Sequence, residues 1–278
     1  MNKSLLIVYH SGAGSTKTIA EIYCCLLENL CTDHQIHLTP ISDKGAFQNI
    51  QEYDLIILGF PTYHSEPPAS MKEFAEEMPP MNTPQKLFLF TTYGLYPANS
   101  LRIIGKQLKK KNYLLCGTAG YRGPATDAAL LLPKISPLLV FGKKTASRLV
   151  DDLLEIKHCL EGGKVNESMP RFKLYSLLNY PNQYFGKRVK HKLQVAAEDC
   201  IHCQQCIKGC FRDCWKPGNA APIFDPTHCE HCFRCIHHCP ESAIILSRKT
   251  KTRVKLTPSF YSNKKELLLA KIHKMIKE

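Results

Sequence analysis

The chain has 278 residues, 44% of them hydrophobic, and a formal net charge of +13. It has no apolar stretch of about eighteen residues, and the apolar run after Lys3 is too short for a signal peptide. Fourteen cysteines are present, eight of them in closely spaced runs, which favours a reducing compartment over a secreted disulfide scaffold. We therefore expect a soluble, cytoplasmic protein with one large and one small domain.

A strand, an anion-binding loop and a helix are predicted at the start of the chain. Residues 3–9 read KSLLIVY, an apolar run rich in β-forming side chains, and SGAGSTKT follows. Apolar residues then recur at helical spacing up to Leu30. A phosphate here would meet the free N–H groups and the positive dipole end of a helix. The candidate ligands in the loop are Ser11, Gly12, Gly14, Ser15 and Thr16.

Two common phosphate motifs do not fit this loop. A nucleotide-binding P-loop needs glycine before its lysine, where Thr16 precedes Lys17. A dinucleotide fingerprint beginning at Gly12 needs a third glycine at the position of Lys17. A strand, turn and helix with polar caps and no ligand remains the alternative to a phosphate site.

The segments that follow predict an α/β domain with a doubly wound parallel sheet. Strand patterns recur at 35–39, 54–59, 86–92 and 112–118, and helical patterns separate them at 68–78 and 98–111. Such alternation places helices on both faces of a parallel sheet. The expected strand order is 2-1-3-4-5, with a ligand crevice at the carboxyl ends of the strands.

The loops after the third and fourth strands carry the remaining candidates for a flavin site. They read GFPTYHSEPP and TTYGLYPANS. A flavin ring needs backbone donors at its pyrimidine edge and aromatic or apolar groups against its plane. Simple packing is the alternative for each aromatic side chain. The candidates are Pro61, Thr62, Tyr63, His64, Thr92, Tyr93, Gly94 and Tyr96. Segment 117–127 is expected to form a further loop, with Tyr121 and Arg122 as secondary candidates.

The rest of the first domain and the linker have distinct compositions. Residues 125–143 are apolar and interrupted by prolines, which predicts an irregular or short helical insert. A helix over 145–160 ends at Gly162 and Gly163, so the first domain spans 1–163. Residues 164–192 hold seven Lys or Arg against one Glu, interleaved with aromatic groups. Short helices that dock the two domains are expected there, and a basic aromatic binding patch is the alternative.

Two cysteine runs of identical spacing dominate residues 193–247, the expected second domain. In each run three cysteines stand at C-x-x-C-x-x-C spacing and a fourth follows after three residues. Such a run ligates a [4Fe–4S] cluster with three thiolates, and its fourth cysteine serves the other cluster. One cluster is thus assigned Cys200, Cys203, Cys206 and Cys239, and the other Cys229, Cys232, Cys235 and Cys210.

Alternatives exist for these ligands. Zinc could use CxxC pairs together with nearby histidines, although zinc sites use pairs of cysteines rather than triplets. Cys214 competes with Cys210 as the fourth ligand, because Cys210 lacks the proline that follows Cys239. We expect Cys214 to be a buried thiol. The histidines near the ligands are expected to be exposed and not to carry protons: His202, His231, His237 and His238.

Short strands at 193–195 and 244–246 are expected to pair across the second domain. The tail, 248–278, holds ten Lys or Arg against two Glu, and its end has apolar residues at helical spacing, from Leu267 to Ile276. A helix that lies on its own protein is expected. Binding to a membrane surface or a nucleic acid is the alternative.

Taken together, YHSGAGSTKT, GFPTYH, TTYGLYPANS and the cysteine runs resemble the flavodoxin-ferredoxin fusion proteins of anaerobic bacteria and archaea. The resemblance covers residues 3–163 and 193–247, with departures at Ala13, Ser15 and Cys24. It implies flavin mononucleotide (FMN) on a flavodoxin-like domain and two [4Fe–4S] clusters on a ferredoxin domain.

The expected function is electron transfer between two [4Fe–4S] clusters and FMN, because a cubane passes one electron whereas a flavin holds one or two. An FMN-dependent reductase of a small organic substrate is the alternative, and a basic binding protein with structural clusters is a third class. The linker and tail leave no room for a nicotinamide dinucleotide domain. Bound cofactors would lower the charge to roughly +7, which favours an acidic redox partner, such as a ferredoxin or flavodoxin.

Overall fold

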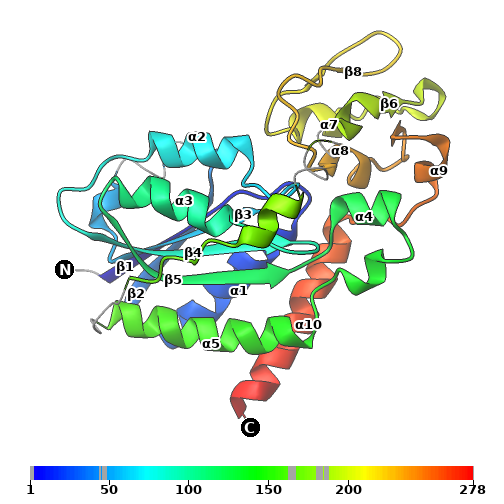
Figure 1. Ribbon diagram of the computed structural model, residues 1–278. Helices are drawn as coiled ribbons and strands as arrows, with labels where there is room; N and C mark the ends of the chain where they lie inside the picture. The colour runs from blue at the N-terminus through cyan, green and yellow to red at the C-terminus, as the bar shows by residue number, and fades with distance from the viewer. Residues whose placement is uncertain are drawn as a thin grey trace.

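The computed structural model describes residues 3–43, 45, 49–161, 167–179, 184 and 188–277. Its centre is a five-stranded parallel sheet with the order β2-β1-β3-β4-β5, which confirms the doubly wound fold (Figure 1). The strands are β1 (Lys3–Tyr9), β2 (His34–Pro40), β3 (Leu55–Pro61), β4 (Gln85–Tyr93) and β5 (Tyr113–Arg122). Every residue of β3 is buried, because helices cover both faces of the sheet.

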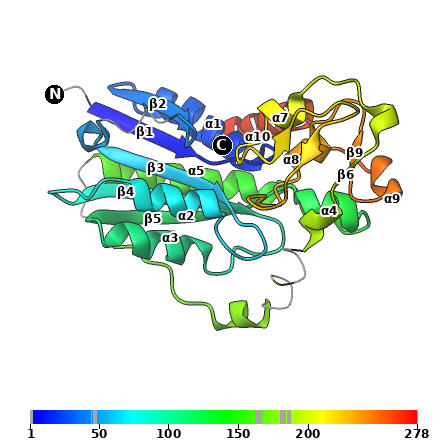
Figure 2. The same cartoon turned by 90° about the horizontal axis from the view of Figure 1, so that it is seen from above.

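Two helical layers complete the first domain (Figures 1 and 2). On one face lie α1 (Ser15–Leu30) and α5 (Lys143–Leu160), and on the other lie α2 (Ala69–Glu77) and α3 (Ser100–Lys109). A short 3-10 helix, η2 (Ile50–Glu52), precedes β3. The helix over 145–160 therefore forms as predicted, and the glycines expected to stop it lie outside the described residues, as does the boundary at 163.

The prediction of a loop over 117–127 is wrong for its first half. Pairing with β4 continues as far as Tyr93 opposite Arg122, so β5 runs through these residues. Tyr121 is buried beneath the sheet, where its hydroxyl donates to Asp152 Oδ2 at 2.5 Å and also bonds the Tyr23 hydroxyl. It therefore does not reach the crevice. Arg122 is exposed and donates to the carbonyl oxygen of Leu95 at 3.0 Å.

Asp152 gives this face of the domain a pH-dependent stability. Burial raises the pKa of its carboxyl to about 6, from 3.8. Because the folded-state pKa is raised, stability is lost as pH rises through about 6, by about 3 kcal/mol at full ionisation. Above about pH 7 Asp152→Asn, which still accepts from Tyr121, is expected to have a constant stability advantage over the parent in urea unfolding, whereas between about pH 4 and 6.5 that advantage should grow. A constant difference over that range would contradict this origin.

The insert and the linker lie against the first domain. The insert contains α4 (Thr126–Leu131) and a 3-10 helix, η3 (Ser136–Leu138). The described part of the linker runs along α3: Arg102 donates to the Pro170 carbonyl at 2.6 Å, and the Asn99 amide accepts from the Lys173 N–H at 2.9 Å. The linker also contains two short 3-10 helices, η4 (Leu174–Asn179) and η5 (Val189–Lys192). Tyr180 and Phe185 of the predicted aromatic set lie outside the described residues.

The cysteine-rich segment forms a small module at the carboxyl ends of the sheet strands (Figures 1 and 2). β6 (Gln194–Val195) pairs antiparallel with β9 (Ile244–Ile245), the pairing expected from the sequence. β7 (Trp215–Lys216) pairs with β8 (Ile223–Phe224), and a 3-10 turn, η6 (Ala197–Asp199), precedes the first cysteine. α7 (Gln205–Lys208) and α8 (Arg234–His237) occupy equivalent places in the two runs, each after a residue in left-handed conformation.

The basic tail returns to the first domain. After a short helix, α9 (Arg248–Lys251), the chain forms α10 (Pro258–Lys277), which lies beside α1 and α5 (Figure 1). Leu268 and Ile272 are buried in the core that those helices share, whereas Leu267, Met275 and Ile276 are exposed. None of the helices described is both long and apolar enough to span a bilayer.

Candidate cofactor sites

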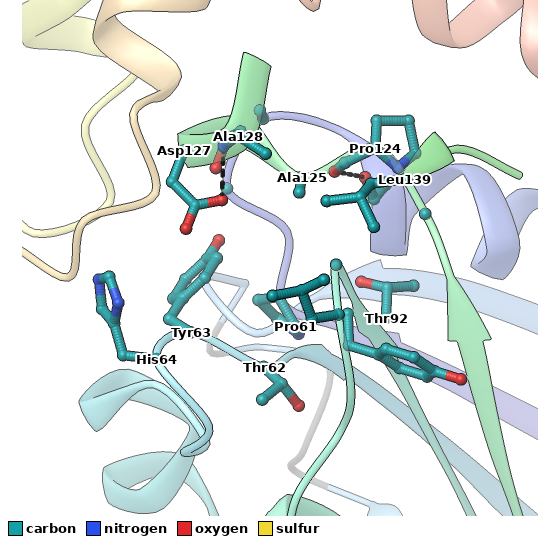
Figure 3. Close-up of a pocket in the computed structure, with 18 of the residues that line it drawn as sticks. Pro61, Thr62, Tyr63, His64, Thr92, Pro124, Ala125, Asp127, Ala128 and Leu139 are labelled. Atoms are coloured by element: carbon teal, nitrogen blue, oxygen red, sulfur yellow. Dashed lines mark hydrogen bonds between the residues drawn. The ribbon is translucent and has the colours of Figure 1, made fainter. Parts of the chain in front are cut away.

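A cavity opens at the carboxyl ends of the sheet strands, where three loops meet (Figure 3). Twelve of the thirteen residues predicted to bind a flavin line it: Ser11, Gly12, Ser15, Thr16, Pro61, Thr62, Tyr63, His64, Thr92, Tyr93, Gly94 and Tyr96. Gly14 is the exception, because it lies on the other side of its loop. The strand order brings these segments together, since β1, β3 and β4 are neighbours.

The opposite wall comes from the second half of segment 117–127, where a further loop was expected, from the insert and from the cysteine-rich module. The turn at Pro124 and Ala125 and the start of α4 face Pro61 and Tyr63 across the cavity (Figure 3). The insert adds Leu132, Ile135 and Leu139, and the cysteine-rich module adds His231. No local motif marks these positions, because their place depends on how the insert and the module fold back.

One end of this cavity is suited to an anion. α1 begins here after Gly14, with no acidic residue in its first turn, so its N–H groups and dipole are available to a negative ligand. The Ser11 hydroxyl oxygen is buried and has no hydrogen-bond partner within the described part of the chain. The Thr16 hydroxyl, also buried, bonds the Thr92 hydroxyl at 2.8 Å. A buried hydroxyl without a partner is unfavourable, and an anion that accepts from Ser11 would satisfy it.

The other end is aromatic. Tyr63 follows β3 and pairs with Glu66 across a tight turn in which His64 and Ser65 are left-handed. The His64 ring meets the His231 ring edge-on at 5.1 Å, which joins this turn to the cysteine-rich module. Tyr96 meets Tyr175 of the linker at 5.6 Å. This end of the cavity is therefore lined by aromatic rings that also carry polar atoms, and not by aliphatic side chains alone.

One group of cysteines surrounds a small cavity in the module. Cys200, Cys203, Cys206 and Cys239 all line it, with Ile201, Pro222 and Ile244 around them. Burial raises the pKa of the Cys206 thiol, and charge on Cys203 and Cys239 raises it further. These are the four cysteines that the spacing assigns to one cluster.

The second group lies at the boundary with the first domain. Cys210, Cys229, Cys232 and Cys235 line a large cavity between the module and the sheet. Burial raises the pKa of Cys232 to about 12, with added contributions from Cys229 and Cys210. Cys214 is buried beside them, and its N–H donates to Cys210 Sγ at 3.4 Å. Cys214 therefore lies near the second group, but its thiol donates to the Arg212 carbonyl at 3.5 Å.

No three His, Cys, Asp or Glu side chains in the residues described are close enough to hold a single metal ion. A cubane has a wider ligand set than a single ion, because each thiolate binds a different iron. Backbone N–H groups also point at these sulfurs, as at Cys239, whose Sγ accepts from Ala243 at 3.2 Å. The Trp215 side chain donates to the Cys235 sulfur. Such donors stabilise thiolate charge.

The expectation that the four histidines are exposed is wrong for three of them. Only His202 is exposed, whereas His231 and His237 are buried and His238 is half-buried. His237 Nε2 bonds the Thr126 carbonyl at 3.0 Å, and its Nδ1 accepts the Leu256 N–H at 3.2 Å. His238 Nε2 bonds the Ala13 carbonyl at 2.8 Å. These imidazoles connect the module to α4, the tail and the first loop.

The two candidate sites touch each other. A methyl group placed on Gly12 would lie 2.2 Å from the Tyr63 hydroxyl and 2.5 Å from Cys232 Cβ, so only glycine fits between them. Arg234 also donates to the Gly12 carbonyl at 3.0 Å. Burial raises the pKa of Tyr63 well above its ordinary value, and Cys232 is the next cause. Cys232, a member of the second cysteine group, therefore contacts the loop that lines the crevice.

A second buried contact fixes the module against the sheet. The Glu230 carboxylate accepts from the Ser70 N–H at 2.5 Å and from the Ser70 hydroxyl at 2.9 Å, at the start of α2. His10 Nε2 lies 3.4 Å from the same carboxylate, and the Phe211 ring packs on His10 at 5.0 Å. Hydrogen bonds from Ser70 and His10 lower the Glu230 pKa despite its burial, which alone would raise it.

Comparison with known proteins agrees with the fold of the first part of the chain. The family model described as flavodoxin matches residues 7–129. No curated protein matches. Among solved structures, a flavodoxin from the domain Archaea is 17% identical with a TM-score of 0.37, over 53% of this chain and 99% of that one. Flavodoxin 1 from Bacillus cereus is 19% identical with a TM-score of 0.44, over 56% and 99%.

The rubredoxin:oxygen oxidoreductase of Desulfovibrio gigas is 13% identical with a TM-score of 0.43, over 58% of this chain and 37% of its own. The flavodoxin match ends at residue 129, so it does not bear on the cysteine runs. The matched residues contain the first loop and the turns after β3 and β4. The N-terminal part of this chain is a flavodoxin-like domain.

Proposed function

We propose that this protein transfers electrons between FMN, bound in the crevice of the flavodoxin-like domain, and two [4Fe–4S] clusters in the C-terminal module. Beyond the flavodoxin-like fold, this function requires FMN in the crevice and iron-sulfur clusters in the C-terminal module. Its support comes from the chemistry of the two sets of donor groups and from the contact between them.

The crevice fits FMN. The α1 N-terminus and the unpartnered Ser11 hydroxyl suit the phosphate, and Thr16 lies beside them. Tyr63, His64 and Tyr93 line the region proposed for the ring. When bound, FMN would accept or give one or two electrons. The protein groups would orient it, exclude water from its plane and supply backbone donors to its edge.

The cysteine groups fit two cubanes. Each group has four cysteines around a cavity, and N–H groups donate to sulfurs in both. The raised pKa values of the thiols do not oppose this assignment, because bound iron holds such sulfurs deprotonated. Cys214 lines the same cavity, and its side chain bonds that of Cys210. Cys210 is retained as the ligand because its spacing matches that of Cys239.

The observation that carries the proposal is the contact of Cys232 with the first loop. Its Cβ approaches Gly12, whose neighbours Ser11 and Ser15 line the crevice. Electron exchange between the two sites therefore needs no diffusive encounter. A net charge of +13 before cofactors further suggests an acidic protein partner, such as a small ferredoxin or flavodoxin.

A flavin-dependent reductase is the second candidate, and the insert favours it. Leu132, Ile135 and Leu139 extend the cavity with apolar surface. Asp127 and His64 also line it and lie at the end away from Leu139 (Figure 3). A small organic molecule could lie against the apolar surface, and the clusters would then supply its electrons. Turnover of such a substrate by the reduced protein would distinguish the reductase from a carrier.

Cofactor content is the first test of the proposal. We expect anaerobically purified protein to contain about eight irons, about eight acid-labile sulfides and about one FMN per chain, because both cysteine sets are complete. Metal analysis, sulfide assay and the visible spectrum measure all three. Stoichiometric zinc without sulfide would contradict the cluster assignment.

A further inference from the structure

The loop before α1 packs against the C-terminal half of the chain on the side that faces away from the crevice. Residues 11–13 form the inner wall of the crevice, and on their other side residues 11–14 face the cysteine-rich module and α10. In this loop the flavodoxin pattern is broken by Ala13. The structure gives a reason for that departure, because Ala13 is buried in an apolar cluster with Ala129, Leu256 and Tyr261.

Tyr261, in the first turn of α10, is the main support. A methyl group on Gly14 would lie 2.4 Å from the Tyr261 ring, so the ring contacts the backbone of the loop directly. Gly14 has φ +147, a conformation that other residues rarely adopt. The Ser15 hydroxyl donates to the Tyr261 hydroxyl at 3.3 Å. Burial raises the pKa of Tyr261 to about 12, so it stays neutral.

Two side chains of the module bind the carbonyl oxygens of the same loop. Arg234 donates to the Gly12 carbonyl at 3.0 Å, and His238 bonds the Ala13 carbonyl at 2.8 Å. Carbonyl oxygens held toward the module leave the N–H groups of the same peptides on the opposite side. Those groups then face the crevice, where a phosphate would need them.

We propose that Tyr261, Arg234 and His238 are positioning residues of the phosphate site, so that the affinity of the flavodoxin-like domain for FMN depends on the docked module and tail. This inference rests on the proposed function, since it takes FMN as the ligand of the crevice. It gives the basic tail a role: α10 anchors on the core through Leu268 and Ile272 and presents Tyr261 to the loop.

The test compares FMN with riboflavin, which lacks the phosphate, on the full-length protein. Dissociation constants are measured by flavin fluorescence after removal of bound flavin. The FMN preference is the dissociation constant for riboflavin divided by that for FMN. We expect Tyr261→Ala to lower this ratio at least about tenfold, because one to two charge-assisted hydrogen bonds to the phosphate are lost. Tyr261→Phe keeps the ring against Gly14 and is expected to stay within about threefold of the parent, since only one weak hydrogen bond is lost.

We call the contacts of Tyr261, Arg234 and His238 with the loop the clamp. Two further variants distinguish an effect of the clamp from a general loss of stability. Leu108→Ala removes a buried side chain from the core on the other face of the sheet, away from α10 and the loop, so it is expected to lower thermal stability and leave the FMN preference unchanged. Arg234→Met removes the bond to the Gly12 carbonyl at nearly constant length, and a lower FMN preference is expected. Circular dichroism shows whether each variant is folded.

The outcomes are distinct. If both Tyr261→Ala and Arg234→Met kept the FMN preference of the parent protein, the role proposed for the clamp would be wrong, while the proposed function would be unaffected. Equal loss of preference in Leu108→Ala would also overturn that role, because the effect would then follow from stability. If the parent protein bound riboflavin as tightly as FMN, the loop would not be a phosphate site. Both the proposed function and the role proposed for the clamp would then be wrong.

Discussion

Replacing Ser11 with Asp is expected to weaken FMN binding at least about 100-fold and riboflavin binding less than about threefold. The Ser11 hydroxyl oxygen is buried, with no hydrogen-bond partner among the residues that the structure describes, at the end of the crevice that α1 makes favourable for an anion. A carboxylate there would repel the phosphate. At an effective dielectric constant of about 20, two unit charges about 4 Å apart interact by about 4 kcal/mol, so screening still leaves a large effect.

Ser11→Asn is the matched control, because Asn has nearly the size of Asp and no charge. It is expected to reduce FMN affinity by no more than about tenfold, about 1.4 kcal/mol, because the Asn amide can still donate a hydrogen bond to the phosphate. Titration calorimetry with both flavins measures the four affinities. A similar loss in the Asp and Asn variants would mean that shape, and not phosphate charge, determines binding at this loop. Equal loss of FMN and riboflavin in Ser11→Asp would place the phosphate elsewhere.

The sequence predicted the sheet well because parallel strands have a strong local signal. The run at 54–59 is apolar throughout, as a strand buried on both faces must be, and the loops that follow each strand had to meet at one edge. Twelve of the thirteen predicted flavin ligands therefore line one cavity. Gly14 was misplaced because glycine at a positive φ serves the backbone and not the ligand.

Other features depended on contacts between distant segments. Residues 117–122 looked like a loop because of their glycines, yet pairing along β4 keeps them extended. His237 and His238 looked like exposed residues beside cluster ligands, but the module folds onto α4 and the first loop and buries them. The Tyr261 contact with Gly14 joins positions separated by most of the chain. No local pattern contains such information, since it arises from how the tail returns to the sheet.

Replacing Cys232 with Ala is expected to slow reduction of the bound flavin at least about tenfold when a reduced low-potential ferredoxin is the donor. Cys232 is the member of the second cysteine group whose Cβ contacts the crevice loop at Gly12. Its loss removes a ligand of the proposed cluster nearest the flavin. Cys25→Ala, on α1 and outside both groups, is the control and should behave as the parent.

Anaerobic stopped-flow absorbance at the flavin band measures these rates at several ionic strengths. The rate for the parent should fall as salt rises, because the Debye length shrinks from about 10 Å at 0.1 M to about 3 Å at 1 M and screens attraction between a basic protein and an acidic donor. NADH alone is expected to reduce the flavin slowly or not at all, since the first loop has Lys17 where a dinucleotide fingerprint needs its third glycine. If the Cys232→Ala protein were reduced as fast as the parent, electrons would enter at the flavin directly. The clusters would then not be the route, and the apolar extension of the crevice would become the place to look for a substrate.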